Sequence, residues 1–216
     1  MSNSRQITAA AIILGLFSLA GTGLVSITHN ATKERIAANE RAVLLDRLNA
    51  ILPPQLYDND IVEDTLKTTS QEYLGSNKPV TVYRARSQGK PIAAVLTPVA
   101  PDGYNGNIQL LVAVLYDGTV AGVRVISHHE TPGLGDAIEE SRSDWVFNFN
   151  GRSLKNPKAK NWQVKRDGGL FDQFTGATIT PRAIVKAVYR TLLFFSENRE
   201  KLFAASESPK KSEAES

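Results

Sequence analysis

The chain has 216 residues, of which 42% are hydrophobic, and its 25 basic and 22 acidic side chains leave a formal net charge of +3. This length allows one main hydrophobic core, with room for a membrane anchor or a small accessory lobe. Basic and acidic residues are interleaved along the chain and do not gather with aromatic residues, which argues against a nucleic-acid partner. The chain contains no cysteine, so it forms no disulfide and offers no thiolate to a metal or an iron–sulfur cluster.

The N-terminal segment carries no Asp, Glu, Lys or Arg between Arg5 and Lys33. Residues 7–27 form an apolar stretch long enough to cross a bilayer of about 30 Å as a helix, and we predict a single transmembrane helix there after a short head of residues 1–6. A cleaved signal peptide is the alternative, because Arg5 and the small residues around Ala20 fit that pattern. The apolar character continues past Ala20, which favours the anchor.

Basic residues are more numerous after the apolar stretch than before it. Only Arg5 precedes the stretch, and four basic residues follow it closely: Lys33, Arg35, Arg41 and Arg47. By the positive-inside rule, this count alone places the following residues in the cytoplasm.

A second apolar pattern follows the predicted anchor. Five aliphatic residues recur at helical spacing with charged residues between them: Ile36, Val43, Leu44, Leu48 and Ile51. The pattern predicts a stalk helix that packs on the following domain and ends at Pro53-Pro54.

The middle of the chain reads as four strands separated by turn residues. The segments are rich in Val, Ile, Leu and Tyr, and they cover residues 80–86, 91–100, 108–116 and 120–127. Asp117-Gly118 is a strong hairpin signal between the last two, and Gly103 and Gly106 mark a tight loop before them. The expected fold class is α+β, with an antiparallel sheet built from local hairpins and flanked by helices.

The sequence HHETPGLGD, residues 128–136, directly follows the last strand. Its proline and glycines predict a rigid loop with little side-chain volume, which could let a flat ligand approach the backbone. His128 and His129 point to opposite faces of a strand, so we expect one packed and one exposed histidine and no shared metal ion. The next segment, residues 138–149, predicts a short amphipathic helix with Trp145 in the core.

The stretch FDQFTGATITP, residues 171–181, precedes a helix. Thr180 is the expected N-cap and Pro181 the first helical residue, and the buried face comprises Ile184, Val185, Val188 and Leu192. The N-terminal end of a helix favours a phosphate, and Arg182 could add positive charge there. By composition alone, an ordinary loop before a helix is the favoured explanation of the stretch.

Four motifs together resemble the FMN-binding domain family: HHETPGLGD, SDW, KRDGG and DQFTGATITPRA. Within that family, the chain is similar to the G subunits of bacterial Rnf/Rsx ion-translocating electron-transport complexes, from the anchor to the helix after Thr180. The resemblance implies an FMN-binding domain over residues 99–200, preceded by a stalk helix and the N-terminal part of the extracytoplasmic domain over 28–98. Residues 201–216 are expected to form a disordered tail.

The resemblance also implies a covalent cofactor. Asp172 to Thr178 match the family's flavinylation signal D-x-x-[S/T]-G-A-T, so Thr178 is expected to carry FMN through a phosphoester. A separate flavin transferase would use FAD as donor and read Asp172. The phosphate and ribityl chain would lie against Thr175, Gly176, Ala177 and Thr180, and the isoalloxazine ring would be bordered by Glu130, Thr131, Pro132, Gly133, Leu134 and Gly135.

The implied function is that of an electron-carrying subunit without catalytic residues or a metal site of its own. Its partners would be the other membrane and peripheral subunits of a complex that moves Na⁺ or H⁺. The flavin domain would lie on the periplasmic side of the bacterial inner membrane, contrary to the count of basic residues. The alternatives are the C subunit of a sodium-translocating NADH:quinone reductase, which also carries FMN on a threonine, and a membrane-anchored binding module without a cofactor.

Overall fold

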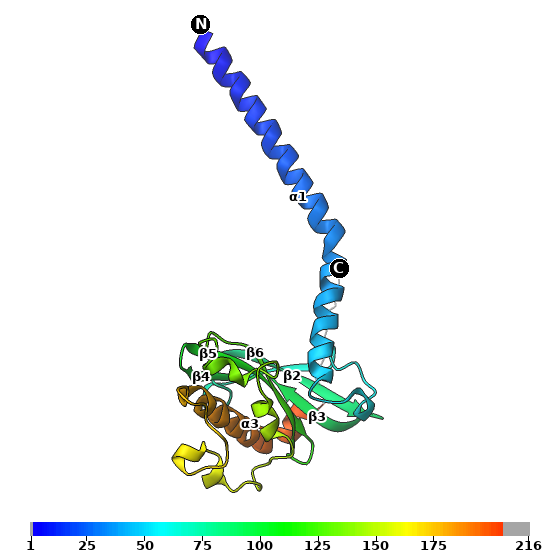
Figure 1. The fold of residues 1–216 in the computed structure, drawn as a ribbon. Coiled ribbons are helices and arrows are strands. Elements are labelled where there is room, and N and C mark those ends of the chain that lie inside the picture. The colour runs from blue at the N-terminus through cyan, green and yellow to red at the C-terminus, as the bar shows by residue number, and fades with distance from the viewer. Residues whose placement is uncertain (1, 205–216) are drawn as a thin grey trace. The chain divides into compact units, whose positions relative to one another are not determined.

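A computed structural model describes residues 2–204, with side chains from residue 5 onward apart from residue 30 (Figure 1). The helices are α1 (Ser2–Asn49), α2 (Gln71–Leu74) and α3 (Ile179–Phe203). The strands are β1 (Thr65–Ser70), β2 (Ser76–Ser87), β3 (Lys90–Leu96), β4 (Val99–Gly103), β5 (Gly106–Leu115) and β6 (Val120–Ser127). Short 3₁₀ helices cover Pro54–Leu56, Gly135–Ile138, Asp144–Phe149, Ala159–Asn161 and Lys165–Asp167. The chain divides into two units, Met1–Leu44 and Leu45–Ser216, which are described separately.

The first unit consists of most of α1. The predicted anchor and stalk are parts of this one continuous helix, and among the described residues α1 alone is long and apolar enough to cross a membrane. Its large apolar side chains are exposed, as Phe17 and Leu24 illustrate at 76% and 68%. Apolar side chains on a helix with no protein cover are expected to face lipid.

Helix α1 ends at Asn49, four residues before the predicted end at Pro53. The amide of Ile51 donates to the carbonyl of Leu48 at 3.2 Å, which tightens the chain into a turn before the prolines are reached. Leu48 and Ile51 are buried, as expected for the packed end of the stalk. Ile36, by contrast, is 48% exposed.

All six strands form one antiparallel sheet in the order β1-β2-β3-β5-β4, and β6 also pairs with β5. The hairpin at Asp117-Gly118 is confirmed, with Gly118 at φ +91°. The expectation of local hairpins is confirmed, because β2 pairs with β3, β5 pairs with β6, and the two strands β3 and β4 both pair with β5. The segment 91–100 is two strands broken at Thr97 and Pro98, where proline offers no amide to a ladder.

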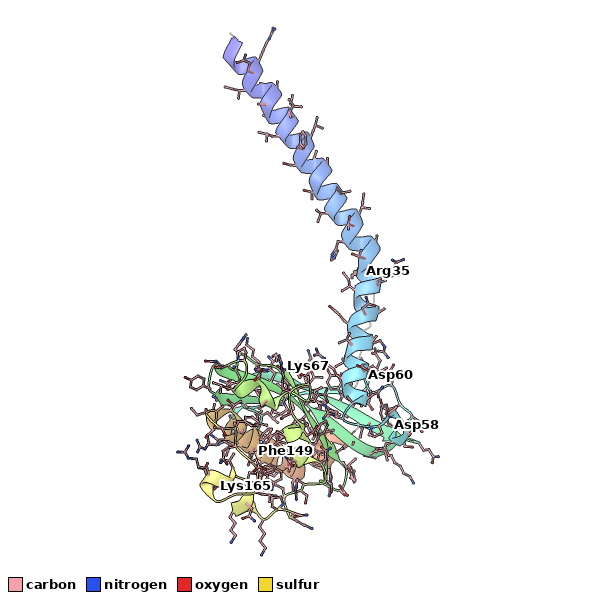
Figure 2. The ribbon with its side chains drawn as sticks, viewed as in Figure 1. Arg35, Asp58, Asp60, Lys67, Phe149 and Lys165 are labelled. Atoms are coloured by element: carbon pink, nitrogen blue, oxygen red, sulfur yellow. The ribbon has the colours of Figure 1, made fainter. Side chains whose placement is uncertain are left out.

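Helix α3 lies along one face of the sheet and contributes the predicted buried side chains, including Ile184, Val188 and Leu192 (Figure 1). They pack against strand residues such as Leu96 and Val112. Figure 2 shows Phe149 inside this dense group of side chains and Lys165 at the surface. The helix continues to Phe203, and residues 205–216 of the expected tail lie outside the described residues.

The amphipathic helix predicted over residues 138–149 was wrong. The chain instead forms two 3₁₀ helices, Gly135–Ile138 and Asp144–Phe149, and the hydroxyl of Ser143 caps the second by accepting from the amide of Trp145. Trp145 is 6% exposed, as expected for a core residue, and its indole N–H donates to the carbonyl of Asp172 at 2.7 Å. This bond anchors Asp172, the first residue of the 172–178 motif, to the core.

Candidate functional site

The two loops predicted to bind a cofactor line one cavity at the N-terminal end of α3. The cavity has a volume of about 290 Å³. Its lining comprises Tyr104, Glu130, Thr131, Leu134, Gly135, Gly176, Ala177, Thr178, Ile179 and Thr180. Eight of these ten residues were predicted from the sequence, and they come from segments more than 40 residues apart in the chain.

The remaining predicted residues lie beside this cavity in the chain but do not line it. Pro132 and Gly133 belong to the first loop, and Thr175 directly precedes Gly176 in the second. Asp172 is exposed, and its carboxylate forms an ion pair with Lys165 at 2.5 Å. An exposed carboxylate is accessible to a modifying enzyme, whereas a cofactor contact requires a place in the cavity wall.

The carboxylate of Glu130 connects three segments around the cavity. Its side chain is buried, with the residue 5% exposed. It accepts hydrogen bonds from the amide of Tyr104 at 3.3 Å, from the amide of Asn105 at 3.0 Å, and from the hydroxyl of Thr180. A buried carboxylate needs such donors, because an unpaired charge in the interior is strongly unfavourable. Glu130 therefore holds the β4–β5 turn and the start of α3 to its own loop.

Two glycines make room for this carboxylate. A Cβ on Gly103 would lie 2.2 Å from the carbonyl oxygen of Gly106 and 2.9 Å from Oε1 of Glu130, and a Cβ on Gly135 would lie 2.8 Å from the Cβ of Glu130. These distances are shorter than the van der Waals contact that a Cβ makes with a neighbouring atom, so an alanine would clash at either position. Gly103 and Gly135 thus allow the close approach of separate protein segments around Glu130.

The predicted start of α3 was wrong by two residues. The helix begins at Ile179, and Thr178 occupies the N-cap position. Thr180 lies inside the first turn, where its hydroxyl is engaged by Glu130 and cannot act as the cap. Pro181 is tolerated there because the first amides of a helix have no partner within the helix.

Thr178 combines three properties of the expected attachment residue. It is half-buried in the cavity wall, and it lies at the positive end of α3. Its hydroxyl makes no capping hydrogen bond to the helix. The hydroxyl is therefore not required for the start of α3.

Arg182 does not supply charge to this cavity, contrary to the expectation. Its guanidinium binds both oxygens of Asp167 at 2.6 and 2.8 Å. This bidentate pair directs the side chain toward the 3₁₀ helix Lys165–Asp167. The hydrogen bonds from Arg182 also lower the pKa of the Asp167 carboxyl.

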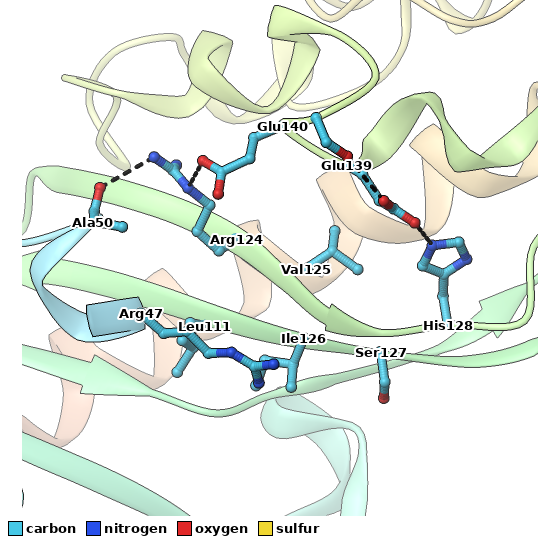
Figure 3. Close-up of a pocket in the computed structure, with 11 residues that line it drawn as sticks. Arg47, Ala50, Leu111, Arg124, Val125, Ile126, Ser127, His128, Glu139 and Glu140 are labelled. Carbon is cyan, nitrogen blue, oxygen red and sulfur yellow. Dashed lines mark hydrogen bonds and ion pairs between the residues drawn. The ribbon is translucent and has the colours of Figure 1, made fainter. Parts of the chain in front are cut away.

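A second cavity, of about 400 Å³, is lined by charged residues of β6 and the chain around Glu139 (Figure 3). Four of its charged or titratable side chains are paired: Arg124 binds Glu140 and also the carbonyl of Ala50, and His128 meets Glu139 at 2.7 Å. Hydrogen bonds from His128, and then from Ser141, lower the pKa of Glu139. His128 is thus the packed histidine, and His129 is the exposed one, as expected.

Sequence reasoning missed two residues of the first cavity, Tyr104 and Ile179. A signal for Tyr104 was present, since an aromatic residue stands in a two-residue turn between Gly103 and Gly106. Aromatic side chains in exposed turns are rarely needed for the core. Ile179 was missed because the start of α3 was placed two residues too late.

Comparison with known proteins identifies the family of the chain. Residues 103–193 match the FMN-binding domain, and residues 1–51 match the RnfG N-terminal region. The G subunit of the ion-translocating oxidoreductase complex from Pseudoalteromonas atlantica is 50% identical over 203 residues, covering 94% of each chain. That of Pseudomonas aeruginosa is 47% identical, covering 94% of this chain and 95% of the relative. The crystal structure of Shewanella oneidensis NqrC is 26% identical, with a TM-score of 0.46, over 68% of this chain and 76% of that one. The chain belongs to the family of G subunits of ion-translocating oxidoreductase complexes.

Proposed function

We propose that this chain is the electron-transfer subunit of an ion-translocating oxidoreductase complex and carries FMN covalently on Thr178. One observation carries the proposal: the separate loops matching the family's flavin motifs line a single cavity, and Thr178 is among its lining residues. The assignment to an ion-translocating complex follows the names of the relatives at 50% and 47% identity.

The residues of the cavity fit a flavin. Gly135 and Gly176 give the wall little side-chain volume where a flat ring must approach, and a Cβ on Gly176 would meet Leu134 at 3.5 Å. The volume, about 290 Å³, lies near the lower end of the range of about 300–1,000 Å³ for small-molecule sites. A cofactor held here would keep part of its surface exposed, which suits exchange of electrons with another subunit.

When bound, FMN would supply one- and two-electron transfer, and the protein would hold and orient it. The start of α3 would face the phosphate with its unpaired amides, and Ala177 and Gly176 would lie beside it. No side chain needs to act as a general acid or base in this role.

The attachment reaction would need a flavin transferase with FAD as donor. The oxygen of Thr178 attacks the phosphorus on the FMN side of the FAD pyrophosphate, a phosphorus–oxygen bond to AMP breaks, and AMP leaves. The hydroxyl proton is released, so the chain gains FMN less one water. Asp172, exposed and close in sequence to Thr178, is the proposed recognition residue for the transferase.

Helix α1 would anchor the protein by a single pass in the bacterial inner membrane, near residues 7–27, with the globular unit on the periplasmic side. Its length and its exposed apolar side chains support the anchor. The periplasmic side follows from the compartment in which the transferase of this family works, and a covalent bond would prevent loss of FMN there. The partners would be the other subunits of the complex.

The test is the intact mass of the chain purified from cells that contain the flavin transferase. We expect one FMN attached with loss of water in the natural chain, none in Thr178→Val, and full labelling in Thr69→Val, a matched control at an exposed threonine of β1 outside the cavity. Labelling that survives in Thr178→Val would show that another residue is the attachment site. An unlabelled natural chain would favour the binding module without a cofactor.

A further inference from the structure

The exposed apolar side chains of the globular unit concentrate at the proposed flavin site. Six large apolar side chains are exposed among its described residues: Leu56, Tyr104, Tyr116, Leu134, Leu170 and Ile179. Three of them line the cavity at the N-terminal end of α3, namely Tyr104, Leu134 and Ile179. Tyr104 is the most exposed of the six, at 66%. Exposed apolar residues that gather in this way mark a surface that another molecule covers.

The backbone that carries Tyr104 is held firmly although its ring is exposed. Tyr104 and Asn105 form the turn between β4 and β5, and both amides donate to the buried carboxylate of Glu130. The side-chain amide of Asn105 also donates to the hydroxyl of Thr131 at 3.3 Å. The turn is therefore tied to the loop on the other side of the cavity.

This arrangement buries a carboxylate, yet the ring it presents contributes little to the core. A tyrosine that served only as a turn residue would not need such support. A flat aromatic ring at the wall of a cavity is suited to pack on a flat heteroaromatic ligand, either by offset stacking or by an edge-to-face contact.

We propose that Tyr104 forms the aromatic wall of the isoalloxazine site and that Glu130 is the positioning residue that holds the Tyr104 turn in place. This inference rests on the proposed function, because it assumes that the flavin attached at Thr178 occupies the cavity. Leu134 and Ile179 complete the apolar wall. The Glu130 carboxylate acts through the turn and through Thr180 and not by binding the ring.

Flavin fluorescence reports this contact directly. An excited flavin takes an electron from a tyrosine ring that touches it, and the electron then returns to the tyrosine, so emission is lost without any net reaction. A phenylalanine can stack but is not readily oxidised, and a leucine can do neither. A bound flavin also gains visible circular dichroism when an aromatic ring packs on it.

The experiment uses full-length, detergent-solubilised chains from cells that contain the flavin transferase, with labelling measured by intact mass. Emission per attached flavin is compared for the natural chain, Tyr104→Leu, Tyr104→Phe and Glu130→Gln. Tyr116→Leu is the control, because Tyr116 lies in the turn between β5 and β6 and packs on Phe203 outside the cavity.

We expect emission to rise several-fold in Tyr104→Leu and Tyr104→Phe and to stay unchanged in Tyr116→Leu. The visible circular dichroism should be kept by Tyr104→Phe and lost by Tyr104→Leu. Glu130→Gln should raise emission, and Tyr104→Leu should add little in that background.

A labelled Tyr104→Leu chain with the emission and dichroism of the natural chain overturns the aromatic wall. A labelled Glu130→Gln chain that behaves as the natural chain overturns the positioning role alone. Absence of FMN from the natural chain by mass overturns the proposed function, and this inference with it, before any emission is compared.

Discussion

The hydroxyl of Thr180 donates a hydrogen bond to the carboxylate of Glu130, a buried residue 50 positions earlier in the chain. This bond links the first turn of α3 to the loop after β6. The amides of Tyr104 and Asn105 complete the arrangement from a third segment. The cavity wall is therefore assembled around one buried acceptor, the Glu130 carboxylate. Changes that remove a donor to this carboxylate, or that crowd it, should lower the stability of the globular unit and the proposed attachment of FMN to Thr178.

Thr180→Val should destabilise the globular unit by about 1–3 kcal/mol, because it removes the hydroxyl that donates to Oε2 of the buried Glu130 carboxylate and leaves that oxygen with one hydrogen bond fewer. Urea unfolding of the full-length chain in detergent, followed by fluorescence of the buried Trp145 and Trp162, measures the change. Thr175→Val is the control, since Thr175 is exposed. In a Glu130→Gln background the same substitution should cost much less, and strictly additive losses would contradict the direct coupling.

Gly135→Ala should be more harmful than its place in a loop suggests. The new methyl would lie 2.8 Å from the Cβ of Glu130 and 3.1 Å from the hydroxyl oxygen of Thr180, and overpacking of this kind costs about 1–3 kcal/mol. Attachment of FMN to Thr178, measured by intact mass, should also fall.

Gly133→Ala is the comparison for this change. A methyl there would meet open space, but its φ of +75° is unfavourable for alanine, at a cost of about 1–2 kcal/mol. It should lose stability without losing attachment. Equal attachment in the two variants would show that the close approach at Gly135 does not shape the site.

Acid should weaken the pair between Asp167 and Arg182. Hydrogen bonds from Arg182 lower the pKa of Asp167 in the folded chain, so the pair stabilises the fold above the ordinary carboxyl pKa. This stabilisation is lost as the pH falls through the lowered value. The effect should be small, because the pair lies at the surface.

Urea midpoints measured from about pH 7 down to about pH 3 test this pair. Asp167→Asn and Arg182→Gln should each flatten the acid side of the profile, and the double variant should flatten it no further. A profile unchanged in both single variants would mean that the pair contributes nothing in solution.

Asp64→Asn should destabilise the end of α3. Asp64 binds Arg84 at 2.5 Å and Arg86 at 2.8 Å, and these arginines donate to the carbonyls of Ala204 and Phe203. Arg84 is only 4% exposed, and removing the partner of a largely buried charge is expected to cost about 2–4 kcal/mol.

Asp58→Asn is the control for Asp64→Asn. The side chain of Asp58 is exposed and accepts one hydrogen bond, from the backbone amide of Gln88 at 2.8 Å. Asp58→Asn should therefore cost no more than about 1 kcal/mol of stability. The same urea measurement serves both variants. Similar losses in the two would contradict a special role for Asp64.

Local features of the sequence predicted most of the elements. The apolar length of residues 7–27, the hairpin at Asp117-Gly118 and the buried face of α3 were all identified, because each depends on neighbours within a few residues. Strand β1 was missed, since its sequence TLKTTS has few apolar residues and acquires its place by pairing with β2.

The site shows the same division between local and distant contacts. The composition of the two loops and their family resemblance identified eight residues of the cavity wall, Thr178 among them, but not the contacts that each side chain makes. Thr180 was expected to cap α3 and instead binds Glu130. Arg182 would add charge at the phosphate only if its side chain faced that way, and it binds Asp167 instead.

The sequence by itself determined an apolar N-terminal helix, a strand-rich domain and the start of a helix that favours a phosphate. Each of these features depends on short-range spacing, turn residues or a helix end, all of which act locally. Only the tertiary structure decided that Glu130 turns inward, that Tyr104 faces the cavity, and that Thr178 is left without a capping role. The physical reason is that a buried carboxylate must find donors wherever the fold supplies them. Here the donors come from segments 25 and 50 residues away, and no local pattern encodes that distance.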